Sequence, residues 1–209
     1  METVDLQDIA RRPQRYWNAD GLPELMMGLL WIVWGGAWIV GERIPRGGVY
    51  NTFWMFVPAL LVLTGWAVVW ATRALKARIT FPRTGYVAWQ APTSSMRLGA
   101  AAISLLTAMI LAATAIKTRN NAPASDLAAP ILGVILSLAF LIAALTQHAP
   151  HYLALAGVAV ALGLALGARG AGWESVNWLF VLIGVASVAV GAARLALFLR
   201  NNPRPSESA

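Results

Sequence analysis

Six apolar blocks of about 20 residues follow one another through most of this 209-residue chain. An α-helix rises about 1.5 Å per residue, so a block of this length crosses a hydrocarbon core about 30 Å thick. Only 12% of the residues are charged, against roughly 25% in soluble domains. The pattern predicts an all-α membrane protein, a six-transmembrane-helix bundle that forms a single polytopic membrane domain over residues 1–209. Its expected spans are at about 22–40, 52–72, 98–116, 127–146, 152–168 and 176–199.

The composition excludes several classes of function. The chain has no cysteine, so disulfides, thiolate catalysis and cysteine-ligated metals are ruled out. A net charge of +7 would suggest nucleic acid as the partner of a soluble protein. Here the basic residues lie between apolar blocks, where they hold the topology and meet anionic lipid. We therefore expect the lipid bilayer, with anionic lipid at its cytoplasmic face, as a partner, and no nucleic acid.

The distribution of basic residues predicts the orientation of the chain. Cytoplasmic loops of membrane proteins carry an excess of Lys and Arg. With the N-terminus inside, eleven basic residues face the cytoplasm and five face outward, which predicts a multi-pass protein with both termini cytoplasmic. The inner set is Arg11, Arg12, Arg15, Arg73, Lys76, Arg78, Arg83, Arg97, Arg194, Arg200 and Arg204, and the outer set is Arg43, Arg46, Lys117, Arg119 and Arg169.

Two polar segments are expected on the cytoplasmic face. Residues 3–12 have acids early and arginines late, which suits a helix dipole, and predict an N-terminal interfacial helix; a disordered tail is the alternative. Between spans two and three, short alternating runs flank Pro82 to Gly85 and predict a short cytoplasmic β-hairpin at about 77–90. An isolated hairpin is marginal in water, so it should dock on the membrane, the N-terminal segment or a partner.

Small residues and turns predict how the later spans pack. The fifth span has two small-residue ridges, one through Gly157 and one through Gly163, and close packing of such ridges drives helix association in lipid. We expect this span to be the packing centre of the bundle. The short QHAPH segment predicts that spans four and five are antiparallel neighbours, and Asp126 is expected to cap span four.

Glu24 is the carboxylate that enters a predicted span. Ionisable residues inside a membrane are costly and usually functional, which allows a gate, a proton site or a cation-binding group at the cytoplasmic mouth. The alternative is structural, because a carboxylate in a first helical turn is stabilised by the helix dipole and could pair with Arg12 or Arg15. Arg194, near the end of the sixth span, is expected to extend to the interface.

The remaining residue patterns argue against cofactors and catalysis. His148 and His151 lie in a tight loop, and two imidazoles without a third ligand rarely hold a metal. Trp31, Trp34 and Trp66 lie deep in the spans and fit either core packing or a cage for a cation. No Ser-His-Asp set, HExxH motif, phosphate-binding loop or close carboxylate pair is present. We expect no catalytic residue, no metal and no cofactor, and we do not expect an enzyme.

Two motifs resemble those of a known family. The segments RYWNADGLPEL and ITFPRTGYV are similar to segments of small, uncharacterised bacterial integral membrane proteins. Those proteins have an aromatic-Asp-Gly-Leu-x-Glu motif before span one and a Pro-Arg-x-Gly-Tyr-Val loop after span two. The resemblance covers about the first half of the chain and implies a bacterial plasma (inner) membrane, without implying an activity. Its signature positions are Tyr16, Asp20, Gly21, Glu24, Pro82, Arg83, Gly85 and Tyr86.

The sequence leaves three functions open. The first is a structural or accessory membrane subunit that binds a membrane or cytoplasmic protein partner through its basic cytoplasmic face. The alternative is a small transporter or channel for an apolar or amphipathic solute, as a homo-oligomer, and a lipid-modifying enzyme is the third. A water-filled cavity reaching Glu24 and Trp31 would favour transport, and a solid core with a cytoplasmic groove around Arg83 and Tyr86 would favour the subunit. The candidate functional cluster is Tyr16, Asp20, Glu24, Trp31, Arg83 and Tyr86.

Overall fold

The structure is a computed structural model that describes residues 20–84, 125–147 and 149–203. These residues form helices, and no strand occurs among them. The long helices are α2 (Leu22–Arg43), α3 (Gly48–Leu75), α7 (Ala128–Gln147), α8 (His151–Gly167) and α9 (Trp173–Asn201). Helix α3 continues through a π-helix, η1 (Lys76–Thr80), into the short α4 (Phe81–Thr84).

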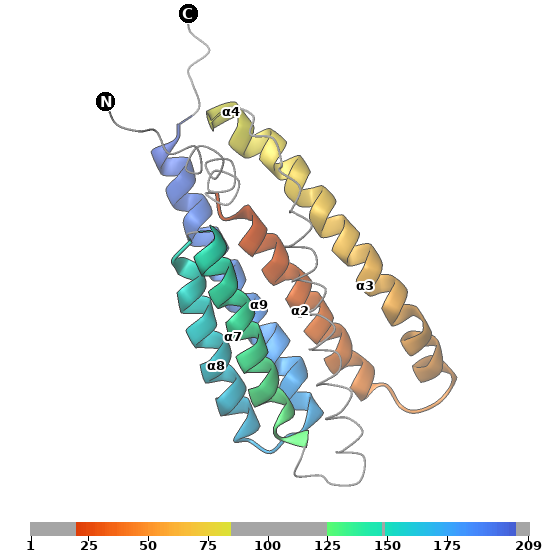
Figure 1. Cartoon of the computed structure of the whole chain (residues 1–209). Coiled ribbons are helices and arrows are strands. Elements are labelled where there is room, and N and C mark those ends of the chain that lie inside the picture. The colour runs from red at the N-terminus through yellow and green to blue at the C-terminus, as the bar shows by residue number, and fades with distance from the viewer. Residues whose placement is uncertain (1–19, 85–124, 148, 204–209) are drawn as a thin grey trace, which may run out of the picture.

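The helices form an elongated bundle (Figure 1). Helix α2 packs along α9, while α7 and α8 form a second pair that contacts α9. The core is buried where α7, α8 and α9 meet, around Leu155, Leu179 and Ile183. Helix α3 lies on the outside of this group, along α2 (Figure 1). Helix α2 therefore stands between α3 and the other three helices.

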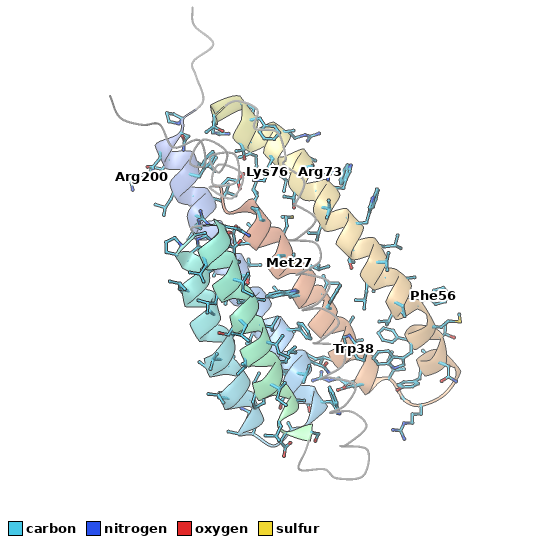
Figure 2. All side chains as sticks on the ribbon, viewed as in Figure 1. Met27, Trp38, Phe56, Arg73, Lys76 and Arg200 are labelled. Carbon is cyan, nitrogen blue, oxygen red and sulfur yellow. The ribbon has the colours of Figure 1, made fainter. Side chains whose placement is uncertain are left out.

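Four helical stretches in the described ranges are long and apolar enough to cross a membrane. They are Leu22–Arg43, Gly48–Thr84, Ala128–Leu145 and Trp173–Asn201, and the apolar α8 is shorter. Along α3, large apolar side chains such as Phe56, Trp66 and Trp70 are exposed, and Phe56 points away from the bundle (Figure 2). Such a surface suits lipid. The predicted all-α fold is thus confirmed for the described residues, whereas the predicted span at 98–116 and the interfacial helix at 3–12 lie outside them.

Glycines on facing sides of α2 and α9 let these two helices approach closely. A Cβ atom on Gly28 would lie 2.6 Å from Gly184 O, and one on Gly184 would lie 2.7 Å from Gly28 O. Gly21 faces Gly191 and Gly35 faces Asn177, so the helices run antiparallel. Gly21, Gly28 and Gly35 are seven residues apart, which is about two helical turns and keeps them on one face. We call this contact the α2–α9 seam.

Helices α7 and α8 are antiparallel neighbours, as the sequence predicts. A Cβ on Gly133 of α7 would lie 2.6 Å from Ala159 O of α8, and a Cβ on Gly163 of α8 would lie 2.8 Å from Ala129 O. One predicted small-residue ridge of α8 is therefore an interface, whereas Gly157, on the other ridge, has open space beside it. The prediction that this helix is the packing centre is wrong for the described helices, because α9 packs against α2, α7 and α8, whereas α8 packs mainly against α7 and α9.

The predicted β-hairpin at about 77–90 is wrong, because residues 77–84 are helical and residues 85–90 lie outside the described ranges. Phe81 N–H donates to Lys76 O, five residues back, which is the wider spacing of a π-helix. In this register Lys76 and Thr80 both reach Asp20. Buried contacts across the bundle therefore override the alternating pattern of the segment.

Candidate functional site

Glu24 lies in the first turn of α2, close to the start of α8 and the end of α9. Its side chain is 1% exposed. Its Oε1 atom accepts a hydrogen bond of 2.8 Å from His151 Nε2 at the start of α8. The same oxygen accepts a bond of 3.1 Å from Arg194 Nη1 near the end of α9. Burying a carboxylate requires a paired charge or several hydrogen bonds, and this network supplies both. We call Glu24, His151 and Arg194 the Glu24 triad.

The imidazole of His151 lies against the guanidinium of Arg194. Arg194 Nη1 lies 2.9 Å from Nδ1 and 2.6 Å from Nε2 of the ring, and Nε2 is also the ring nitrogen that contacts Glu24 Oε1. The three side chains therefore form one compact polar contact between α2, α8 and α9.

The second oxygen of Glu24 is not satisfied in the same way. Glu24 Oε2 is buried and has no hydrogen-bond partner in the described part of the chain. A buried charged oxygen without a hydrogen-bond donor keeps its full desolvation penalty, which is about 1–3 kcal/mol or more. Such an oxygen therefore marks a place where a ligand or water can bind. All protein donors of the triad are on the Oε1 side.

A cavity of about 260 Å³ adjoins Glu24. Four helices contribute to its wall, and it is predominantly apolar. We call it the Glu24 cavity; the described residues that line it are Pro23, Glu24, Met27, Trp31, Leu136, Ala139, Phe140, Ala143, Tyr152, Leu155 and Ser187. An apolar cavity with few polar groups is the usual form of a small-molecule site.

Three aromatic rings form a continuous part of this wall. Trp31 and Phe140 meet edge to face with their centroids 5.7 Å apart. Phe140 and Tyr152 are stacked at 6.1 Å. The Tyr152 hydroxyl also interacts with the Glu24 carboxylate, although the geometry leaves Oε2 without a hydrogen bond in the described residues. The rings therefore extend from the carboxylate along the cavity, and they come from α2, α7 and α8.

A second polar cluster ties the start of α2 to the end of α3. Lys76 Nζ contacts Asp20 Oδ2 at 2.5 Å, and Thr80 Oγ1 donates to the same oxygen at 2.7 Å. Asp20 Oδ1 accepts from Leu22 N–H at 3.1 Å, and the intervening Gly21 has a φ of 73°, which favours glycine. Asp20 and Lys76 are at most 1% exposed. We call Asp20, Lys76 and Thr80 the Asp20 cluster.

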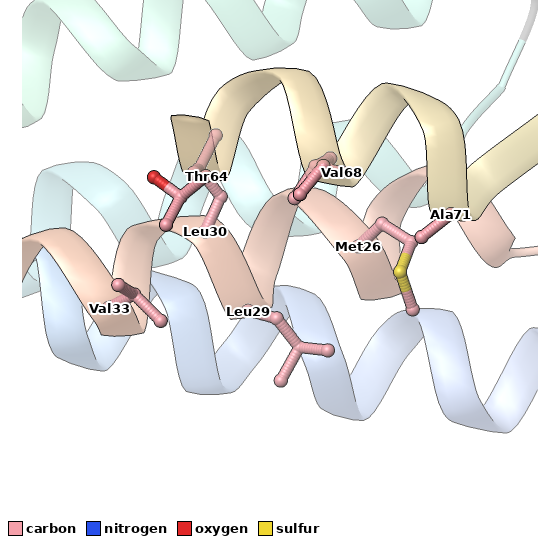
Figure 3. A pocket seen from close by; sticks show the side chains of 8 residues that line it. Met26, Leu29, Leu30, Val33, Thr64, Val68 and Ala71 are labelled. Carbon is pink, nitrogen blue, oxygen red and sulfur yellow. The ribbon is translucent and has the colours of Figure 1, made fainter. Parts of the chain in front are cut away.

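A second cavity, of about 220 Å³, lies between α2 and α3. Figure 3 shows its lining, with Leu30 and Val33 from α2 facing Thr64 and Val68 from α3. Its one hydroxyl, that of Thr64, already donates within its own helix and accepts from Trp34 Nε1. This α2–α3 cavity therefore offers apolar contact without an available charged group.

The structure brings together some of the predicted site residues and separates others. Asp20 and Glu24 are both buried, in different clusters, and Trp31 lines the Glu24 cavity. Arg83 joins neither cluster, because its Nη1 donates to Ile79 O one turn back in the helix. Tyr16 and Tyr86 lie outside the described residues, as do Arg12 and Arg15, the predicted partners of Glu24.

Several residues of the site were predicted to lie elsewhere. Arg194 was expected to extend to the interface and instead turns to Glu24, while His151 was expected in an interfacial loop. Lys76 was expected in a cytoplasmic loop and is buried. Asp126, expected to cap α7, accepts a hydrogen bond from Gly172 N–H before α9. Each new partner is more than forty residues away in sequence, so no local pattern could indicate it.

Within residues 20–84, 125–147 and 149–203, no group of three His, Asp or Glu side chains is placed to hold a metal ion. The sequence matches no protein-family model and no curated protein, and the structure matches no solved structure.

Proposed function

We propose that this chain is an integral membrane protein that binds a small amphipathic solute in the Glu24 cavity and carries it across the bilayer. The observation that carries the proposal is the buried Glu24 Oε2, which lacks a hydrogen-bond partner in the described residues and adjoins an apolar cavity. The apolar wall suits the body of the solute, and the free oxygen suits its polar head. The cavity is lined by both Glu24 and Trp31, the two residues that a transport path was expected to reach.

The arrangement of the helix ends supports a six-span topology with both termini on one side, and the resemblance of the two motifs supports a bacterial plasma membrane. The start of α2 and the end of α9 lie at the same end of the bundle, which fits termini on one side. Thr84 lies at this same end, because its hydroxyl donates to Thr80 O and the Thr80 hydroxyl donates to Asp20. Ser125 lies at the other end, beside Gly172. This separation supports a further span at 98–116. The Glu24 end also carries the described basic residues that the positive-inside rule places in the cytoplasm.

A cysteine placed in the cavity tests the proposal. The chain has no cysteine, so a single substitution introduces a unique thiol. Ser187 and Ser175 on α9 are both 2% exposed, but only Ser187 lines the cavity, while Ser175 donates to Leu166 O. In vesicles, S187C should react with a small membrane-impermeant thiosulfonate, and S175C should not. A carrier site must open to water on both sides, so reaction is expected from either side of the membrane.

Equal protection of the two cysteines would contradict the proposal, because a solute site closed to water at all times cannot load or release. Reaction from one side only would indicate a binding site without transport. Purified S187C and S175C should show the same elution volume as the parent protein, which confirms that the comparison is between folded molecules.

A structural or accessory subunit is the second candidate, and one observation favours it. Arg73 and Arg78 are exposed at the end of α3, and Arg200 lies at the same end of the bundle (Figure 2). This basic surface suits anionic lipid or an acidic partner protein. Purification in mild detergent with mass spectrometry of bound proteins and lipids tests it. R73E and R78E should release a specific partner, whereas R43E, at the opposite end, should retain it.

A further inference from the structure

The free oxygen of Glu24 defines the polar group that the Glu24 cavity can accept. An ionised carboxylate has about four lone-pair sites and donates no hydrogen bond. The two donors of the triad occupy Oε1, and Oε2 remains without a donor in the described residues. The head group of a ligand must therefore donate a hydrogen bond, and an anionic head group would meet the carboxylate at close range.

The aromatic side chains beside this oxygen also favour a particular charge on the ligand. Trp31, Phe140 and Tyr152 form a contiguous aromatic surface, and the faces of such rings attract cations. The guanidinium of Arg194 contacts Oε1 of the carboxylate at 3.1 Å. A cation at Oε2 would meet the carboxylate first and the guanidinium only beyond it, so attraction prevails.

The volume and composition of the cavity limit the rest of the ligand. At about 260 Å³, the cavity is smaller than the roughly 300–1,000 Å³ typical of pockets for drug-sized ligands. Met27, Leu136 and Leu155 supply apolar contact away from the carboxylate. The ligand is therefore short, with one polar head and an apolar body.

We infer that the Glu24 cavity binds a small organic cation, a protonated amine on a short apolar body, with Glu24 Oε2 as its counter-ion and the three aromatic rings around it. This inference rests on the proposed function, since it names the solute class for the same cavity.

Three probes that share a six-carbon tail separate the alternatives: n-hexylammonium, 1-hexanol and hexanoate. The full chain in nanodiscs of zwitterionic lipid is titrated with each at pH 7, and binding to empty nanodiscs is subtracted. Hexylammonium and hexanol can both donate a hydrogen bond to Oε2, but only the ammonium group adds attraction between opposite charges. Hexylammonium should therefore bind about tenfold or more tightly than hexanol, a difference of about 1.4 kcal/mol. Hexanoate should bind most weakly.

Two pairs of variants assign the effect to the cavity. E24Q should reduce the preference for hexylammonium over hexanol to less than about threefold, whereas E42Q, on the same helix but bonded to Asn177, should keep it. Ala139 on α7 and Ala161 on α8 are both exposed, but only Ala139 lines the cavity. A139L adds bulk to the cavity wall and leaves the Glu24 side chain unchanged, so it should weaken both hexylammonium and hexanol, whereas A161L should weaken neither.

The outcomes distinguish this inference from the proposed function. If hexanol binds as well as hexylammonium and A139L abolishes both, the solute cavity stands and the cation inference is overturned. A preference for hexanoate also overturns it. If none of the three probes binds above the empty nanodisc, both the inference and the proposed function fail. Should E24Q not fold, A139L and the comparison of the three head groups still decide the question.

Discussion

A lysine that is 1% exposed inside a helical bundle requires an opposite charge, and Lys76 has one in Asp20. Taking two charges out of water costs several kcal/mol per ion, and only close pairing with further hydrogen bonds compensates for it. Thr80 and the Leu22 N–H supply those bonds. The Asp20 cluster therefore fixes where the end of α3 lies on the start of α2, and the pair is sensitive to the loss of either member.

We predict that K76M destabilises the fold by about 3–5 kcal/mol, because it leaves the buried Asp20 carboxylate without its ion pair. Thermal unfolding in detergent, followed by circular dichroism, measures the effect. The double variant D20N/K76M removes both charges and should recover a large part of the loss. R78M alters an exposed residue of the same π-helix and should change stability little. An equal loss in K76M and R78M would contradict a structural role for the pair.

The sequence indicates which acids of the site matter, but not what they bind. Asp20 and Glu24 stand out locally, because they flank the start of an apolar block that otherwise lacks carboxylates. Their partners Lys76, His151 and Arg194 are separated from them by 56, 127 and 170 residues. Such pairings depend on the packing of helices, and a single sequence contains no local signal for them.

At the scale of elements, the α2–α9 seam depends on backbone contact rather than on large side chains. In lipid, helices gain little from burying apolar surface against one another, so close approach over small residues supplies the association energy. Gly28 and Gly184 stand opposite each other with no room for a methyl group. Close packing over small residues was predicted for α8. The glycines of α2 in the seam are seven residues apart, and a search for GxxxG does not find that spacing.

We predict that G28A destabilises the bundle by about 1–3 kcal/mol, the usual range for overpacking a tight contact. The added Cβ would lie 2.6 Å from Gly184 O and 2.7 Å from Val188 N, so the two helices must move apart. G36A on the same helix meets open space and should be neutral or slightly stabilising, since alanine favours helix more than glycine does. Thermal unfolding of the two variants side by side is the measurement, and equal melting temperatures would rule out the seam.

The segment after α3 shows where local pattern and tertiary contact disagree. Its alternating apolar residues and Gly85 favour a hairpin, yet residues 76–84 continue the helix. The reason lies outside the segment, since Asp20 draws Lys76 and Thr80 to one side. The bounds of the other long helices agree with the predicted spans to within four residues, because the length of each apolar block largely determines them.

On the scale of the whole molecule, the membrane orientation is the property that a direct experiment can establish. We predict that N201C, at the end of α9, is labelled by an impermeant maleimide from the cytoplasmic side, and that G48C, at the start of α3, is labelled from the outside. Both positions are exposed, and Gly48 has open space at its Cβ. Labelling in intact cells and in inverted vesicles measures this. The reverse pattern would contradict the orientation inferred from the basic residues.

The pairing of α2 with α9 also has a consequence for biogenesis. About 150 residues separate Gly28 from Gly184, and synthesis at about 5–20 residues per second makes α2 wait roughly 8–30 s for its neighbour. During this interval Glu24 is in the nascent chain without Arg194, and the glycine face of α2 is open to lipid or to an insertion chaperone. A ribosome stalled before α9 would leave an incomplete chain in which Glu24 lacks the partner that it has in the folded protein.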